Sequence, residues 1–149
     1  MANVFVGLGS NKGNRKKNIL RAIEILKKNN RKILKISSIC ETKPYGYRKQ
    51  RNFLNAVVKL KTALSPGNFL LLCKKIEKEI GRKKVFRWGP REIDIDILFF
   101  DKKVLKSRKL TIPHKDLHNR EFVLTPLSEI APNFVHPVLK KRIFEIRNV

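Results

Sequence analysis

A β-forming run that two carboxylates interrupt places the strongest constraint on how this chain folds. Residues 93–100 read Ile-Asp-Ile-Asp-Ile-Leu-Phe-Phe, which is too short and too rich in β-formers for a helix. Alternate side chains of a strand share a face, so the isoleucines are expected on one face and Asp94 with Asp96 on the other. Two anions about 7 Å apart at their Cα atoms repel each other and resist burial. A divalent cation would relieve both problems.

A basic loop comes directly before this strand. Arg87 and Arg91 flank a Gly-Pro turn at residues 89–90, so cationic groups are expected beside the acidic pair. Carboxylates that can hold Mg²⁺, next to arginines that can bind phosphate oxygens, are the parts that phosphoryl transfer needs. The alternative is that the two aspartates simply form a solvated face of the strand, and the chemistry alone leaves both interpretations standing.

The size and composition of the chain predict one cytoplasmic domain over residues 1–149. The chain has 149 residues, of which 42% are hydrophobic, and this is enough for a single core. No apolar run of membrane-spanning length and no signal-peptide pattern is present, so we expect no membrane association. Cys40 and Cys73 lie in apolar segments without metal-ligand spacing, and we interpret them as reduced core thiols.

The net charge of +23 is the most unusual feature of the composition. Such a charge ordinarily suggests a nucleic-acid or membrane-surface partner. The lysines, however, are spread along the whole chain, and no zinc-finger, RRM or KH pattern accompanies them. We therefore favour a solvated surface that reflects the base composition of the source genome over specific nucleic-acid binding. A polyanionic substrate would be attracted in either case.

The periodicity along the chain predicts an α+β fold. Strands are expected at residues 3–9, 31–40, 53–62 and 93–100, and helices at residues 16–29 and 65–80. Ser65 before Pro66 is an N-cap followed by proline at the first helical position, and Gly81 ends that helix. The order is ferredoxin-like (βαββαβ), with an antiparallel sheet, both helices on one face and the other face open for a site. Short strands and helices are expected to form a C-terminal extension after residue 100.

Three further features point to a site outside the acidic strand. The loop at residues 41–51 is long for a compact domain, and such loops are often functional. Asn55 is a polar residue in an otherwise apolar strand. Gly7 and Gly9 permit a close approach of the first strand's backbone.

The segment at residues 87–98 resembles the signature of the 6-hydroxymethyl-7,8-dihydropterin pyrophosphokinases, a family of folate biosynthesis. Four further blocks keep the family's order and approximate spacing, at residues 6–11, 41–46, 53–56 and 113–122. The resemblance implies transfer of diphosphate from ATP to the hydroxymethyl group of the pterin, with release of AMP. It implies ATP as co-substrate, two Mg²⁺ ions as cofactor, a ferredoxin-like fold and a monomer whose partners are these small molecules.

The resemblance also assigns the catalytic residues. Asp94 and Asp96 match the family's acidic pair, which holds the two Mg²⁺ ions against the phosphates. Arg82 and Arg91 match two loop arginines that clamp the phosphates. Trp88 belongs to the same loop and would close over the site and exclude water.

The pterin site that the resemblance implies consists of Thr42, Pro44, Tyr45, Phe53, Asn55, Trp88 and Phe122. In this site Phe53 and Phe122 would sandwich the flat ring in offset stacks. The amide of Asn55 would read the donor and acceptor edge of the ring, together with Thr42.

The ATP site that the resemblance implies consists of Glu77, Lys84, Arg91, Ile97, Thr111, His114 and Arg120. His114 and Arg120 match phosphate contacts, whereas Thr111 and the backbone of Ile97 match the positions that read adenine. Lys84 stands where the family commonly has arginine, so it keeps the charge but loses the bidentate fork.

Two alternatives belong to other classes. A basic RNA-binding α+β domain would want exposed aromatic residues on the central strands, where Asp94 and Asp96 would repel phosphate unless a metal is bound. A degenerate pyrophosphokinase kept for another role is the second alternative, but none of the motif residues is lost outright.

Overall fold

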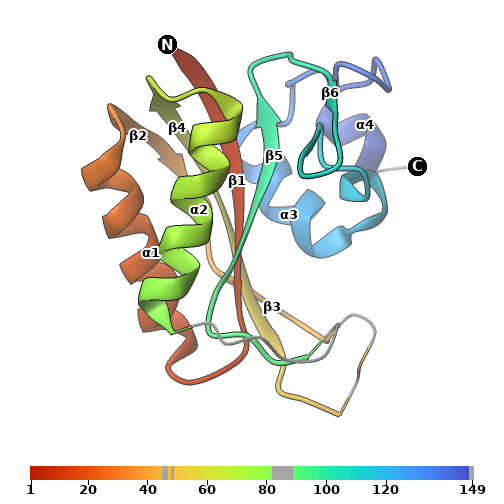
Figure 1. The fold of residues 1–149 in the computed structure, drawn as a ribbon. Coiled ribbons are helices and arrows are strands. Elements are labelled where there is room, and N and C mark those ends of the chain that lie inside the picture. The colour runs from red at the N-terminus through yellow and green to blue at the C-terminus, as the bar shows by residue number, and fades with distance from the viewer. Residues whose placement is uncertain (45–46, 48, 82–88, 148–149) are drawn as a thin grey trace.

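The computed structural model describes residues 1–44, 47, 49–81 and 89–147, and in this part of the chain a five-stranded sheet forms the centre (Figure 1). Its strands are β1 (Ala2–Ser10), β2 (Lys32–Ile36), β3 (Cys40–Thr42), β4 (Phe53–Thr62) and β5 (Asp94–Phe100). Along the path β2-β4-β1-β5 each neighbouring pair is antiparallel, and β3 pairs with β4 beyond the end of β2. The predicted antiparallel sheet with helices is confirmed.

Two helices, α1 (Arg15–Asn29) and α2 (Pro66–Ile80), cover one face of the sheet (Figure 1). The side chains of Asn14 and Ser65 cap the first turns by accepting hydrogen bonds from Lys17 N–H and Asn68 N–H. Gly81 ends α2 with φ of 104°, a left-handed conformation that favours glycine. The predicted start and end of this helix are therefore confirmed.

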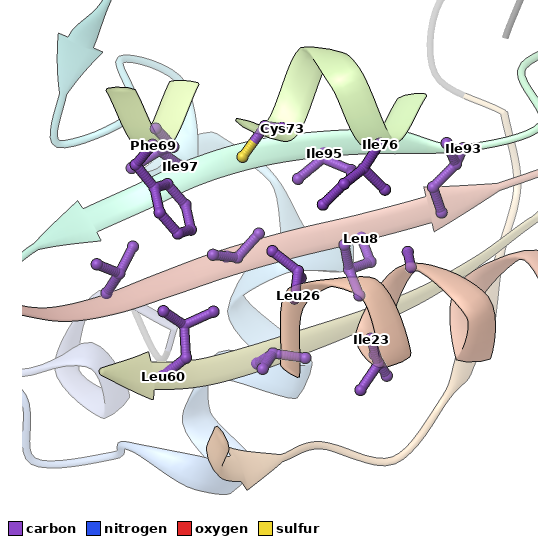
Figure 2. Close-up of a cluster of buried hydrophobic side chains, with 14 of the residues drawn as sticks. Leu8, Ile23, Leu26, Leu60, Phe69, Cys73, Ile76, Ile93, Ile95 and Ile97 are labelled. Atoms are coloured by element: carbon purple, nitrogen blue, oxygen red, sulfur yellow. The ribbon is translucent and has the colours of Figure 1, made fainter. Parts of the chain in front are cut away.

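The alternation in β5 divides its side chains as the sequence predicts. Ile93, Ile95 and Ile97 are buried against the two helices, in the apolar layer that Figure 2 shows. Asp94 and Asp96 point to the opposite face. Their cross-strand partners in β1 are Gly9 and Gly7, which carry no side chains that could cover the carboxylates.

The opposite face of the sheet is open only in part, and this corrects the expected architecture. Helix α3 (Glu121–Ile130) packs there, with α4 (Ile143–Arg147) and the short 3₁₀ helix η1 (Leu117–Asn119) beside it. A second core joins these elements to the sheet through Phe5, Val57, Leu98, Phe99 and Leu127. A small hairpin of β6 (Leu105–Lys106) and β7 (Thr111–Ile112) connects β5 to this region. These short strands and helices match the kind of elements expected after residue 100.

The strand expected at residues 31–40 is divided into β2 and β3, so the prediction of one continuous strand is wrong. Ser37 causes the break, because its backbone N–H donates to the oxygen of Val57 at 2.9 Å while its Oγ accepts from Val57 N–H at 2.8 Å. A side-chain oxygen thus takes the place of a backbone carbonyl in the ladder. Regular pairing with β4 resumes at Cys40.

Both cysteines are free, but only one is a core residue. Cys73 is buried in the helix-covered core, where burial raises the pKa of its thiol to about 12. Cys40 is only half-buried in β3. None of the helices in the described part of the chain combines the length and the apolar composition that a bilayer crossing needs.

Candidate active site

A pocket opens on the sheet face that α1 and α2 leave uncovered, beside the second core. It brings together most of the predicted site residues, which reach it from β3, β4, β5, the start of α3 and the loops before β5 and η1. These residues are Thr42, Phe53, Asn55, Arg91, Asp94, Asp96, His114, Arg120 and Phe122.

The two carboxylates of the acidic pair influence each other's charge state. Burial raises the pKa of the Asp96 carboxyl to about 7, and the charge of Asp94 adds to this effect. The guanidinium of Arg120 opposes the rise, but its Nη1 lies 3.9 Å from Asp96 Oδ2, and its Nη2 also faces Asp116 Oδ2 at 3.7 Å. Arg120 is thus shared between Asp96 and Asp116, and burial remains the largest influence on the pKa of Asp96.

A bound cation would favour the ionised form of Asp96, and the donor set suits magnesium. Within the described ranges, no three side chains among His, Cys, Asp and Glu gather into a metal cluster. A metal at Asp94 and Asp96 would take its other ligands from water and from a phosphate-bearing substrate. Mg²⁺ binds in this way, through one or two carboxylates plus phosphate oxygens, whereas structural zinc requires more protein ligands.

Two of the residues predicted to bind the ring, Phe53 and Asn55, lie next to Gly9. Asn55 Nδ2 donates to Thr42 Oγ1 at 2.6 Å, so its amide is held in one orientation, and the side chain is only 6% exposed. A Cβ added at Gly9 would lie 3.2 Å from Asn55 Oδ1 and 3.5 Å from Phe53 Cδ1. The absence of a side chain at Gly9 therefore provides the room that both residues occupy. Phe122 lies across the pocket at the start of α3, with the guanidinium of Arg120 5.6 Å from its ring centroid.

His114 is neutral at pH 7 and has a defined tautomer. Its Nδ1 accepts a hydrogen bond from Asp116 N–H at 3.2 Å, so the neutral ring carries its proton on Nε2. Burial and, to a smaller extent, the positive charge of Arg120 lower the pKa of the imidazole to about 4. The ring can therefore donate one hydrogen bond without adding charge.

Other predicted residues do not line this pocket. Glu77 lies on the helix-covered side, 4% exposed, where its carboxylate accepts from Ile95 N–H at 2.9 Å. Ile97 is buried in the same core. Pro44 follows β3, and Thr111 lies in β7 next to β5. The remaining predicted residues lie outside the described part of the chain: Tyr45, Arg82, Lys84 and Trp88.

Some lining residues were not singled out from the sequence. Ala56, Val57 and Val123 read as ordinary core residues, and nothing in the periodicity distinguishes them. Lys43 is one basic residue among many in a long loop. Asn11 is different, because it lies outside the pocket lining but belongs to a block that carries the family resemblance. It is 1% exposed and hydrogen-bonded to two other loops.

The protein is an α+β protein with one pocket that contains an acidic pair, arginines, a fixed amide and aromatic rings. Such a site suits phosphoryl transfer to a flat substrate. The family model described as 7,8-dihydro-6-hydroxymethylpterin-pyrophosphokinase (HPPK) matches residues 5–132. The chain belongs to this family.

Similar proteins come from several organisms. A 2-amino-4-hydroxy-6-hydroxymethyldihydropteridine pyrophosphokinase of Aquifex aeolicus is 50% identical over 147 residues, which are 99% of this chain and 91% of that protein. The protein of the same name in Bacillus subtilis is 42% identical, over 85% of this chain and 77% of its own length. The folic acid synthesis protein fol1 of Pneumocystis carinii is 47% identical over 91% of this chain, but this region is only 18% of that protein.

A solved structure of an HPPK-DHPS in complex with substrates has the same fold. The TM-score is 0.80, and the match covers 99% of this chain and 43% of that chain. At 17% identity this match supports the fold alone.

Proposed function

We propose that this protein transfers the diphosphoryl group of ATP to the hydroxymethyl group of 6-hydroxymethyl-7,8-dihydropterin and releases AMP. Family membership makes the chain a pyrophosphokinase of folate biosynthesis. The observation that carries the detailed proposal is the meeting of Asp94 and Asp96 with Phe53 and Asn55 in one pocket. This arrangement supports a site that binds a polyanion next to a flat ring.

The proposal extends to the architecture. We take residues 1–149 as one ferredoxin-like pyrophosphokinase domain, with a C-terminal extension after β5, acting as a cytoplasmic monomer. The strand order β2-β4-β1-β5, with α1 and α2 on one face, supports the ferredoxin-like assignment.

Asp94 and Asp96 are the residues that would hold Mg²⁺, for which we propose two ions. When bound, Mg²⁺ would neutralise the charge that develops on the transferring and leaving phosphates. The raised pKa of Asp96 supports this role, since burial and the charge of Asp94 disfavour the ionised carboxylate that a bound cation would stabilise.

The phosphates would lie against cationic and neutral donors from three elements. Arg91 and Arg120 offer planar forks that match phosphate oxygens, and His114 offers its Nε2–H. These donors orient the β-phosphorus for in-line attack by the hydroxymethyl oxygen. The new O–Pβ bond forms as the bond from Pβ to the bridging oxygen breaks, so AMP leaves with that oxygen and the hydroxyl proton is released.

The pterin would stack between Phe53 and Phe122, with the amide of Asn55 against its polar edge. Because the bond from Asn55 Nδ2 to Thr42 Oγ1 fixes the amide, Asn55 presents one donor–acceptor pattern rather than two. The remaining predicted contacts keep their proposed roles. Pro44, Tyr45 and Trp88 complete the pterin side, and the nucleotide side comprises Glu77, Arg82, Lys84, Ile97 and Thr111.

The direct test is AMP release by purified protein supplied with ATP, MgCl₂ and the hydroxymethyl dihydropterin. Asp96→Asn is expected to lower kcat by at least about 1,000-fold while circular dichroism stays unchanged, because one of the two carboxylates that would hold Mg²⁺ is lost. Glu24→Gln, an exposed change on α1, is the matched loss of one negative charge and should keep the wild-type rate. A folded wild type that releases no AMP, or an Asp96→Asn variant with full activity, would contradict the proposal.

A further inference from the structure

Asn11, in the loop between β1 and α1, holds the backbone of Arg91 from both sides. Its backbone N–H donates to the carbonyl oxygen of Arg91 at 3.0 Å, and its Oδ1 accepts from Arg91 N–H at 2.8 Å. The two bonds form a closed ring, and this ring fixes the position of the Arg91 backbone in the loop before β5. Since Asn11 is 1% exposed, water cannot replace these bonds at no cost.

The other end of the same side chain holds the pterin side of the site. Asn11 Nδ2 donates to Gln50 Oε1 at 2.8 Å and to the carbonyl oxygen of Arg51 at 3.1 Å. Gln50 in turn donates through Nε2 to the oxygen of Tyr47 at 2.6 Å. Strand β4, which carries Phe53 and Asn55, begins two residues after Arg51. Both donors of the Asn11 amide are thus used toward the loop before β4, and its oxygen is used toward the loop before β5.

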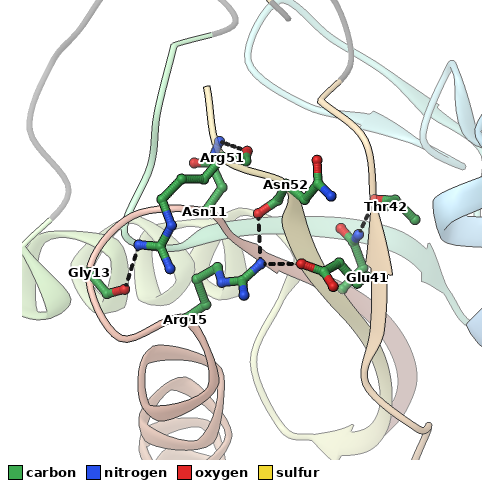
Figure 3. A network of polar contacts seen from close by, with 8 residues as sticks. Asn11, Gly13, Arg15, Glu41, Thr42, Arg51 and Asn52 are labelled. Carbon is green, nitrogen blue, oxygen red and sulfur yellow. Dashed lines mark hydrogen bonds and ion pairs between the residues drawn. The ribbon is translucent and has the colours of Figure 1, made fainter. Parts of the chain in front are cut away.

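Neighbouring contacts strengthen the attachment of these loops to the start of α1 (Figure 3). Arg51 Nη1 donates to the oxygen of Gly13 at 3.0 Å. Arg15 Nη1 donates to Glu41 Oε2 at 2.7 Å and to the oxygen of Asn52 at 3.0 Å. These contacts hold only the pterin side, and on the other side Lys12 Nζ forms an ion pair with Glu92 Oε1 at 3.3 Å. Asn11 is the residue through which both loops meet.

We propose that Asn11 is a positioning residue that couples the pterin side of the site to the phosphate-binding Arg91. This inference rests on the proposed function, because it assumes that the two loops serve two substrates. When one substrate orders its loop, the amide of Asn11 lowers the entropic cost of ordering the other. By linkage, pterin then strengthens nucleotide binding by the same factor as nucleotide strengthens pterin binding.

Two variants at this position separate the two ends of the bridge. Asn11→Ala removes all three side-chain bonds. Asn11→Asp keeps the acceptor for Arg91 N–H but loses both donors and puts a carboxylate against the oxygen of Arg51. Gln50→Ala removes one bond of the bridge without touching Arg91. Asn14→Ser is the matched control, because it lies in the same loop and a serine can keep the cap of α1.

The measurement is titration of a non-hydrolysable ATP analogue with Mg²⁺, in the presence and absence of pterin, together with kcat and KM. We expect Asn11→Asp and Asn11→Ala to lower kcat by about 10- to 100-fold, since a displaced arginine loses alignment. The factor by which pterin raises the analogue's affinity should fall toward one, whereas affinity for the analogue alone changes less than about 3-fold. In Gln50→Ala the factor by which pterin raises the analogue's affinity should be partly reduced. In Asn14→Ser this factor should equal that of the wild type.

Amide hydrogen exchange in the ligand-free protein gives a readout that needs no reaction. Exchange at residues 50–52 and 89–92 should be faster in Asn11→Asp than in Asn14→Ser. If the wild type releases no AMP, the proposed function fails, and exchange alone decides whether Asn11 joins the loops. If the wild type is active and Asn11→Asp keeps both its coupling factor and its exchange rates, the inference fails by itself. If Asn11→Ala does not fold, the inference still fails when both Asn11→Asp and Gln50→Ala keep the wild-type coupling factor.

Discussion

Gly9 determines how closely the ring-binding residues approach β1. It pairs with Asn55 on one side and Asp94 on the other, so a side chain here would point into the pocket between them. Gly9→Ala would place a Cβ 3.2 Å from Asn55 Oδ1. We expect the amide to shift by a few tenths of an ångström and the KM for pterin to rise about 10-fold, equivalent to about 1.4 kcal/mol.

Steady-state kinetics with each substrate varied in turn test this prediction. The KM for ATP should change much less than the KM for pterin, because the clash is on the pterin side. Gly67→Ala provides the control, since no heavy atom lies within 4 Å of its added Cβ and it should raise stability by about 0.5 kcal/mol with unchanged kinetics. Equal effects of Gly9→Ala on both substrates would argue against a pterin site at this position.

His114 makes the stability of the ligand-free protein depend on pH in a defined sense. Its pKa is lowered from 6.5 to about 4, so between these values the unfolded state binds a proton that the folded state does not. The free energy of unfolding therefore falls as the pH falls from 6.5 to 4 and is unaffected by this group above that range. Asp96, whose pKa is raised from 3.8 to about 7, acts in the opposite sense over the same range.

The contribution of His114 is isolated by comparison with His114→Gln. Relative to the wild type, this variant should gain about 2 kcal/mol in unfolding free energy as the pH is lowered from 7.5 to 4. This change in free energy is smaller than the value that corresponds to the full pKa shift, because the ring is only partly buried. Urea unfolding at several pH values measures it, with the exposed His118→Gln as the control. Parallel profiles for wild type and His114→Gln would mean that the ring is not held neutral.

The sequence predicts residues best where their role follows from a local rule. The period of a strand was sufficient to place Asp94 and Asp96 on one face, and the isolated polarity of Asn55 marked it correctly as unusual. Asn11 could not be found in this way. Its hydrogen bonds depend on three loops that are distant in the sequence, and a pattern within one segment contains no information about where other loops end.

At the scale of elements, Ser37 separates β2 from β3, which both pair with β4. Ser37→Ala would leave the buried N–H of Val57 without the acceptor that it has 2.8 Å away. We expect a loss of about 1–3 kcal/mol in unfolding free energy, the usual cost of a buried unpaired donor. Urea denaturation measures the loss, and the exposed Ser38→Ala, which keeps the backbone bonds to Glu129, should cost less than about 0.5 kcal/mol. Equal effects of the two changes would mean that the Oγ of Ser37 is not part of the ladder.

Helix ends were predictable and strand interruptions were not. Ser65, Pro66 and Gly81 carry their capping chemistry in their own side chains or conformational freedom, so the ends of α2 follow from the sequence. The alternation of apolar residues continues across residues 31–40, so this pattern does not indicate the hydrogen bonds between Ser37 and Val57. The position of α3 over part of the open face is likewise a tertiary result, because its apolar residues show only that it packs somewhere.

At the scale of the whole molecule, the two faces of the sheet have different tasks. One face is fully occupied by α1 and α2, and it forms the larger core. The other is divided between the second core under α3 and the pocket. Strands β4, β1 and β5 contribute residues to both faces. The packing on the helix-covered face therefore sets the register of these strands, and this register aligns Asn55, Gly9 and Asp94 on the pocket face. The site is therefore built on the most constrained strands of the fold.

The net charge of +23 should affect stability and substrate binding in opposite directions. The chain has 35 Lys and Arg residues and 12 Asp and Glu residues. The positive charges therefore repel one another in the folded protein, and salt screens this repulsion. Raising NaCl from about 0.02 to 0.5 M should raise the Tm by several degrees. The same screening weakens the field that draws ATP toward the pocket, so the KM for ATP should rise about 3- to 10-fold.

The neutral pterin is the internal control for this last prediction. Its KM and the kcat should change less than about 2-fold over the same salt range, because screening acts on charged encounters and not on ring stacking. Thermal unfolding and steady-state kinetics in one set of buffers measure all of these quantities. If the KM values of both substrates rose together, salt would be acting on the protein's conformation. If neither changed while the Tm rose, the charge would be a property of the solvated surface alone, with no part in attracting the substrate.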